Sequence, residues 1–214
     1  MVPKGLVDSA RTTGCYAFRA DVPASCIKPI GTDSTKIPFV NSAARNFPVY
    51  YTVVGVASNF GSNAEGLFLM RVVAIGLVAW MLTWAATACM KTRRPGLALS
   101  GLFLSITPMF AYLGGVVNPN SIEIAAAYAT AVCSLVFFAD PKSAVGERNL
   151  RRAAIAATIL GSTRILGPAW LAIWVVALLI MQRKELFTLP LKARNRWVLL
   201  APVVGVVANM GWMQ

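Results

Sequence analysis

Residues 66–90 read GLFLMRVVAIGLVAWMLTWAATACM, an apolar stretch whose single charged residue is Arg71. A helix needs about 20 predominantly apolar residues to cross the bilayer core. Lipid offers no hydrogen-bond partner to an exposed backbone, so a stretch of this kind must be helical. Residues 66–90 therefore predict a transmembrane helix, which is closed by the basic residues Lys91, Arg93 and Arg94.

Further apolar stretches follow, and Lys and Arg residues are concentrated between them. They predict spans at residues 96–117, 121–139, 153–181 and 197–213. The stretch 153–181 is too long for one untilted crossing and is interrupted at Gly167-Pro168, which predicts two short helices that form a hairpin and meet near residues 162–167. Residues 140–152 are expected to form a basic loop. The predicted fold class is all-α, a polytopic transmembrane helical bundle over residues 62–214.

The composition excludes several classes of protein. With 57% hydrophobic and 13% charged residues, the chain is too apolar for a soluble domain of 214 residues. No basic face with interleaved aromatic residues appears outside the short loops, so we expect no nucleic-acid partner and attribute most of the net charge of +12 to the positive-inside rule. The chain has no histidine and no cysteine pair with metal-binding spacing, so no cofactor is evident and no metal site is predicted. Cys89 and Cys133 lie in apolar stretches and are predicted core residues.

Residues 1–61 differ from the rest of the chain. They are punctuated by Gly, Pro, Ser, Thr and Asp without a strong helical period, which predicts loops and short strands. Residues 46–57 predict a short interfacial helix, because Pro48 suits a first helical turn and paired tyrosines are typical of headgroup depth. Residues Ser62 to Glu65 have the pattern of a capping box ahead of the first span.

The basic loops predict the orientation. If residues 1–61 are extracytoplasmic, all three basic loops fall on the cytoplasmic side, provided that residues 153–181 enter the membrane and return. We therefore expect a multi-pass protein of the plasma (inner) membrane with residues 1–61 outside. Cys15 and Cys26 would then lie in an oxidising compartment at hairpin-like spacing, which favours a disulfide. No signal peptide precedes this polar segment, so we expect the chain to be part of a longer membrane protein.

Charged and amide side chains gather on the predicted extracytoplasmic side. Arg71 lies near the outer start of the first span, and Arg164 lies at the tip of the hairpin. The turn that contains Asn118 and Asn120 joins the second and third spans, and Glu123 follows it. Two guanidinium groups at one depth suit a phosphate, because their planar forks make bidentate and permanently charged contacts. We predict that Arg71 and Arg164 bind the phosphate of a polyprenyl-phosphate carrier, with the other three residues lining the site.

Each of these residues also has a purely structural interpretation. Glu123 follows Asn120 by three residues and could complete a capping box. Arg71 could extend its side chain to the interface, and Arg164 could form an ion pair with Glu123. Asn118 and Asn120 could be turn residues only.

Five motifs carry a resemblance to a known family. In chain order they are Arg45-Asn46-Phe47-Pro48-Val49-Tyr50-Tyr51, Leu69-Met70-Arg71, Thr107-Pro108-Met109-Phe110, Val117-Asn118-Pro119-Asn120-Ser121-Ile122-Glu123-Ile124-Ala125-Ala126-Ala127 and Thr163-Arg164-Ile165-Leu166-Gly167-Pro168. This order resembles an actinobacterial membrane-protein family, catalogued as domain of unknown function 2142, which is similar to the GT-C glycosyltransferases. The resemblance covers most of the chain, and its motifs are distinctive in combination.

The resemblance implies a partial GT-C-like bundle with an extracytoplasmic active site, which takes a sugar from a polyprenyl-phosphate donor. Such enzymes usually draw their catalytic base from an acidic residue in the first extracytoplasmic loop. In the family that motif precedes the segment matching residues 1–60, so this chain lacks it and would be inactive alone. Asp8 is a weak candidate in the right region, where no motif selects it over Asp21 or Asp33. The family's outer loop contains cysteines, which supports pairing of Cys15 with Cys26.

The chemistry of the implied reaction is coherent with these residues. Glycosyl transfer needs a base for the acceptor hydroxyl, and it needs cations or a metal for the departing phosphate. Arg71 and Arg164 could supply the cations, and a divalent metal is left open.

The leading hypothesis is a fragment of a GT-C-like glycosyltransferase that acts on cell-envelope glycans or lipids. One alternative is a transporter or flippase for a lipid-linked substrate, because broken helices with charged tips also build transport sites. Transporters usually contain an internal repeat, and the chain has no second copy of the Asn118-Pro119-Asn120 motif. Another alternative is a non-catalytic membrane scaffold, in which replacing Arg71 or Arg164 by Lys would leave the cell phenotype unchanged.

Overall fold

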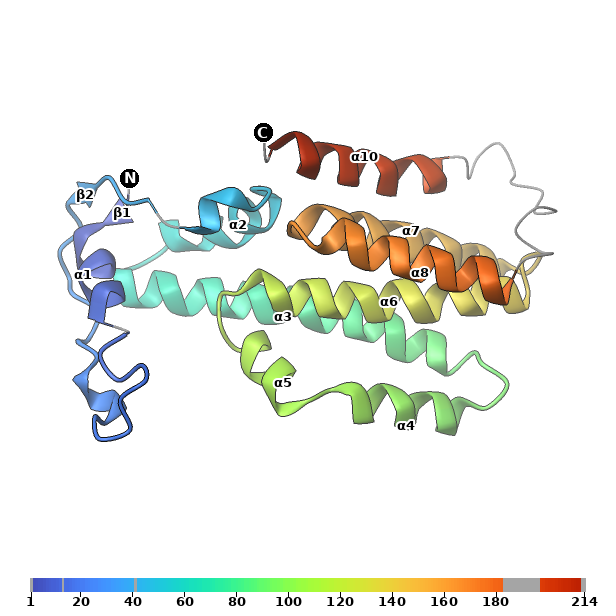
Figure 1. Ribbon diagram of the computed structural model, residues 1–214, viewed down its shortest axis with the longest axis horizontal. Helices are drawn as coiled ribbons and strands as arrows, with labels where there is room; N and C mark the ends of the chain where they lie inside the picture. Colours follow the sequence, from blue (N-terminus) through green and yellow to red (C-terminus); the bar gives the residue numbers. More distant parts are fainter. Residues whose placement is uncertain (1, 13, 41, 183–196, 213–214) are drawn as a thin grey trace. The chain divides into compact units, whose positions relative to one another are not determined.

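A computed structural model describes residues 2–12, 14–40, 42–182 and 197–212 (Figure 1). Helices make up most of these residues, and the prediction of an all-α membrane protein is confirmed. The chain divides into two compact units, an N-terminal unit of residues 1–44 and 51–73 and a helical unit of residues 45–50 and 74–214. Within the described ranges, two helices are long and apolar enough to cross a membrane, and a bent pair of shorter helices is a third candidate.

The N-terminal unit contains a helix that the sequence analysis did not expect. Its first elements are β1 (Val2–Pro3), α1 (Lys4–Thr12), η1 (Ala24–Cys26) and β2 (Lys36–Ile37), and the two strands pair antiparallel. The prediction of loops and short strands was wrong for α1. So short a helix is marginal by itself, but tertiary contacts support it. Val7 is buried, and the backbone N–H groups of Lys4 and Gly5 donate to the carbonyls of Thr35 and Asp33 at 2.8 and 2.9 Å.

The same unit holds the start of the long helix α3 (Asn63–Cys89). The predicted capping box is confirmed, because the Ser62 N–H donates to Glu65 Oε2 at 2.7 Å and the Glu65 N–H donates to Ser62 Oγ at 3.5 Å. Asn63 Nδ2 donates to the carbonyls of Gly31 and Asp33 at 2.8 and 3.1 Å. These hydrogen bonds connect the loop before β2 to the start of α3. Hydrogen bonds from the Thr35 side chain and backbone lower the pKa of Asp33.

Where one interfacial helix was predicted over residues 46–57, the chain forms α2 (Val49–Gly55) followed by the 3₁₀ turn η3 (Val56–Asn59). Tyr50, Val54 and Ala57 are buried, whereas Val49, Val53 and Val56 are exposed.

The helical unit is organised around a central helix. It contains the later part of α3 and the helices α4 (Pro95–Ser105), α5 (Pro108–Gly114), α6 (Pro119–Ala139), α7 (Ala144–Thr163), α8 (Gly167–Met181) and α10 (Trp197–Trp212). Helix α7 packs against α6, α8 and α10; α6 and α8 run antiparallel to it, whereas α10 runs parallel to it (Figure 1). Small residues permit this close packing. A Cβ on Gly161 would lie 2.8 Å from Val206, and one on Gly205 would lie 3.0 Å from Thr158.

The predicted span over residues 96–117 is not one continuous helix, because α4 and α5 are separate helices bent by 74°; together they are a candidate broken span or re-entrant loop. Thr107 is extended and caps α5, since its side chain accepts from the Phe110 N–H at 3.2 Å. A residue before proline disfavours the helical conformation, and Pro108 cannot donate a backbone hydrogen bond. The Tyr128 hydroxyl donates at 2.8 Å to the carbonyl of Ser105, at the end of α4.

The predicted loop over residues 140–152 was also wrong, because α7 begins at Ala144 and contains most of it. Ser143 caps the helix by accepting from the Gly146 N–H at 2.9 Å. The apolar part of α7 therefore carries a charged extension of about two turns. Cys89 and Cys133 are free and buried, as predicted for core residues.

Candidate functional site

The sharp turn between α7 and α8 positions the most informative polar side chains. Helix α7 ends at Thr163 and α8 begins at Gly167, whose N–H donates to the Arg164 carbonyl at 3.0 Å. A Cβ on Gly167 would lie 2.0 Å from the carbonyl oxygen of Leu160, so the turn requires glycine at this point. Pro168 follows as an early helical residue, where its missing N–H costs little.

Arg164 lies in this turn and contacts the first turns of α6. Its Nη1 donates to Asn120 Oδ1 and lies 3.6 Å from Glu123 Oε2. The Arg164 side chain is 34% exposed and that of Glu123 is 8% exposed. The structure therefore brings together three of the predicted site residues, from elements that are more than 40 residues apart in sequence.

Glu123 is the most unusual member of this cluster. It is buried, and among the described residues its Oε1 has no hydrogen-bond partner. The capping box proposed for Asn120 and Glu123 was wrong, because Asn118 is the cap of α6 and Glu123 turns toward Arg164. A buried carboxylate oxygen without a partner costs free energy. The site therefore offers an acceptor to any hydroxyl or amine that reaches it.

Asn118 shapes the turn before α6. Its side chain accepts from the Asn120 N–H at 2.9 Å, and its carbonyl accepts from the Ser121 hydroxyl at 2.8 Å. The contacts of Asn118 are therefore those of a turn residue, as its structural interpretation predicts. Asn120 differs, because its side chain reaches Arg164.

Asn209 on α10 is a residue that the sequence analysis missed. It is fully buried, and its Nδ2 donates to the carbonyls of Gly161 at 3.0 Å and Arg164 at 2.7 Å. These carbonyls belong to the end of α7, where a helix leaves its last acceptors unsatisfied. An amide inside an otherwise apolar span is costly in lipid, and that signal could have identified Asn209.

The remaining predicted residues belong to the N-terminal unit. Arg71 is exposed on α3, and its cooperation with Arg164 stays a prediction. Asp8 forms an ion pair with Lys4 at 3.3 Å, and Lys4 also lies 3.7 Å from Asp33. Cys15 and Cys26 are joined by a disulfide. Within the described ranges, no three His, Cys, Asp or Glu side chains group in a way that could hold a metal ion.

The family described as predicted membrane protein (DUF2142) matches residues 2–213 of the chain. The chain belongs to the DUF2142 family. The match includes both the disulfide-bonded N-terminal unit and the helical unit, so both are part of the DUF2142 region. No curated protein and no solved structure matches this DUF2142 chain.

Proposed function

We propose that this integral membrane protein is part of a GT-C-like glycosyltransferase, which binds a polyprenyl-phosphate sugar donor on the extracytoplasmic side of the plasma membrane. The observation that carries the proposal is the cluster of Arg164, Asn120 and Glu123 at one end of the helical unit. It combines a partly exposed guanidinium with a buried carboxylate oxygen that has no partner in the described part of the chain.

The cluster has complementary chemistry for the head of a lipid-linked sugar. Arginine offers five N–H donors in a rigid fork, and the contacts to Asn120 and Glu123 both involve Nη1. The remaining donors suit phosphate oxygens, and Glu123 Oε1 suits a sugar hydroxyl. Arg164 is thus assigned to recognition of the donor phosphate, whereas the roles of Arg71 as a second phosphate ligand and of Asp8 as a candidate base, both in the N-terminal unit, stay predictions.

The position of the cluster fits a ligand with a lipid tail. Helix α6 is long and apolar enough to span the bilayer, and the cluster involves its first two turns. The positive-inside rule favours the extracytoplasmic side for this end, because the basic stretches lie at the other ends of the predicted spans.

The first prediction concerns donor binding by the native protein in lipid nanodiscs. We expect Arg164→Ala to weaken binding of a polyprenyl-phosphate sugar by about 100-fold, because charge-assisted hydrogen bonds contribute about 1.5–3 kcal/mol. Membrane insertion should be unchanged. Arg151→Ala is the matched control, since Arg151 pairs with Glu147 at 2.6 Å within α7, far along the helix from the cluster. Titration with a fluorescent donor measures the binding affinity of both variants.

Removal of Arg164 leaves Glu123 buried without its ion pair, so Glu123→Gln with Arg164→Ala is tested as well. Donor binding by Arg164→Ala at the affinity of the wild type would remove Arg164 from the site. If the donor binds and crosses to the other leaflet of proteoliposomes without sugar transfer, the transporter or flippase alternative replaces the transferase. If neither the wild type nor Arg164→Ala binds the donor, and Arg164→Lys leaves the cell phenotype unchanged, the scaffold alternative replaces the transferase and the transporter.

A further inference from the structure

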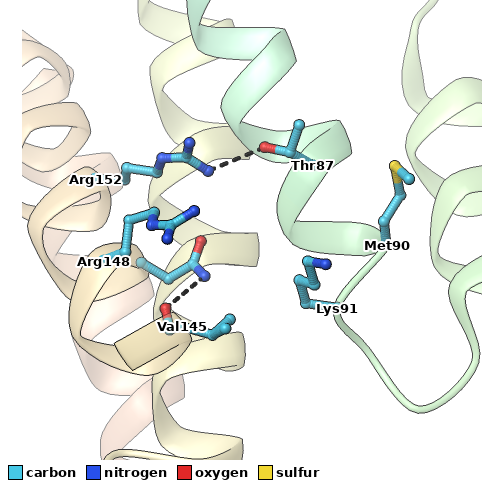
Figure 2. A pocket seen from close by; sticks show the side chains of 7 residues that line it. Thr87, Met90, Lys91, Val145, Arg148 and Arg152 are labelled. Atoms are coloured by element: carbon cyan, nitrogen blue, oxygen red, sulfur yellow. Dashed lines mark hydrogen bonds between the residues drawn. The ribbon is translucent and has the colours of Figure 1, made fainter. Parts of the chain in front are cut away.

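A second polar site lies in the helical unit, where α7 begins and α3 ends. A cavity of about 260 Å³ opens between these elements, and its cationic lining residues are Lys91, Arg148 and Arg152 (Figure 2). Figure 2 shows Arg148 and Arg152 extending from α7 toward the side on which Thr87 lies. Arg148 precedes Arg164 by 16 residues along α7, and a helix rises 1.5 Å per residue, so Arg148 is about 24 Å along the helix from the Arg164 cluster.

The cavity concentrates positive charge, and among the described residues it has no acidic partner. Within the described part of the chain, no carboxylate forms an ion pair with any of its three cations, whereas neighbouring Arg151 pairs with Glu147. Arg152 is held in place, because it donates to Thr87 Oγ1 at 3.0 Å and lies over the Trp84 ring at 5.7 Å. Like charges that converge on one cavity repel one another, and a bound anion relieves the repulsion.

Asn149 adds a hydrogen-bond acceptor to this basic site. Its side chain is 2% exposed, and its Nδ2 donates to the Val145 carbonyl at 2.9 Å. Its Oδ1 has no partner among the described residues. An acceptor among three cations suits a ligand that carries a donor beside its negative charge, such as a hydroxyl next to a phosphate.

The border of the cavity is apolar and exposed. Met90 and Val145 line it and are 60% and 38% exposed. The positive-inside rule places this end at the cytoplasmic interface. Basic pockets between transmembrane helices on that side bind anionic lipid headgroups. Exposed apolar side chains beside the cations provide a surface for acyl chains, which a soluble phosphate ester does not need.

We propose that this cavity binds the headgroup of an anionic glycerophospholipid of the cytoplasmic leaflet. Its phosphate contacts Lys91, Arg148 and Arg152, and a headgroup hydroxyl donates to Asn149 Oδ1. The proposal does not depend on the function assigned to the Arg164 cluster.

The test uses the native protein with defined lipids and counts bound lipid by native mass spectrometry. We expect phosphatidylglycerol to be retained in preference to zwitterionic phosphatidylcholine. Lys91→Gln with Arg148→Gln should lower retention about 30-fold, since each basic residue near the surface contributes about 1 kcal/mol. Arg93→Gln with Arg94→Gln removes the same charge from the adjacent loop outside the cavity, so it should retain the lipid.

Two further measurements compare ligands on the wild-type protein. They do not depend on whether a variant folds. Phosphatidylglycerol should bind more tightly than phosphatidylmethanol, which has the same charge and lacks the headgroup hydroxyls. Millimolar glycerol 3-phosphate should not displace the lipid. Equal loss in both charge variants would show a diffuse basic surface and overturn the cavity assignment. Equal binding of the two lipids would overturn the role of Asn149, and displacement by glycerol 3-phosphate would make the ligand a soluble phosphate ester.

Discussion

Arg164 contacts two different helices, one through its side chain and the other through its backbone. Its guanidinium contacts Asn120 and Glu123 on α6, and its backbone carbonyl accepts from Asn209 on α10. The amide of Asn209 thus holds the backbone of the turn whose side chain forms the candidate site. We assign Asn209 as a positioning residue, because it reaches the site only through Arg164.

Asn209→Ala tests this assignment. It removes two interhelical hydrogen bonds, and such bonds in membranes contribute roughly 0.6–2 kcal/mol each. We expect a loss of about 2 kcal/mol in the free energy of unfolding, measured by denaturant titration in detergent, together with weaker donor binding. Asn59→Ala is the control, because Asn59 is exposed and bonds only to the nearby Val56 carbonyl in the described structure. Unchanged stability of Asn209→Ala would show that these bonds contribute nothing.

At the scale of elements, the break between α7 and α8 determines where the site lies. Three residues separate the two helices, and close packing of Gly167 on the Leu160 carbonyl makes the reversal tight. Helix α7 can occupy the centre of the unit because its buried face consists largely of Ala, Gly and Ser residues. The low hydropathy of α7 is therefore compatible with a membrane, since protein rather than lipid surrounds much of it.

Gly167→Ala should open this turn. The added Cβ cannot be accommodated 2.0 Å from a carbonyl oxygen, and overpacking of this kind typically costs about 1–3 kcal/mol. We expect a lower unfolding temperature and weaker donor binding, since Arg164 would move with the turn. Gly76→Ala on α3 is the matched control, because an added Cβ there meets nothing within 4 Å. The same unfolding temperature for both variants would contradict the packing argument.

At the scale of the whole molecule, the chain carries a disulfide-bonded polar segment and a helical unit with different chemistry at its two ends. Arg164, Glu123 and Asn209 lie at one end, and the basic cavity lies at the other. Two phosphate-binding sites on opposite faces of the bilayer would give the protein contacts with both leaflets.

The orientation of the protein can be measured through its disulfide. In intact cells, a membrane-impermeant reductant followed by an impermeant maleimide should label Cys15 and Cys26, because we place their segment outside. A cysteine introduced at Ser143, before α7, should react only after permeabilisation. Cys15→Ser with Cys26→Ser is the control for background, since Cys89 and Cys133 are buried. Labelling of the native pair only after permeabilisation would reverse the predicted orientation.

Local patterns in the sequence were sufficient for several features. The apolar stretch over residues 66–90 predicted α3, and the pattern from Ser62 to Glu65 predicted its capping box. The interruption at Gly167-Pro168 predicted a helix break near its true place. The extension of α7 to Ala144 and the break at Thr107-Pro108 were missed, although Ser143 and Pro108 carried the local signals.

Membrane insertion and helix ends were determined by the sequence itself, because hydropathy and capping depend on residues within a turn or two of one another. The tertiary structure decided which polar groups meet. Asn209 bonds to Arg164 across 45 residues, and Arg152 bonds to Thr87 across 65. Such contacts depend on which helices pack together and at what depth. That arrangement is the result of small-residue packing around α7, a property of the whole bundle rather than of any one segment.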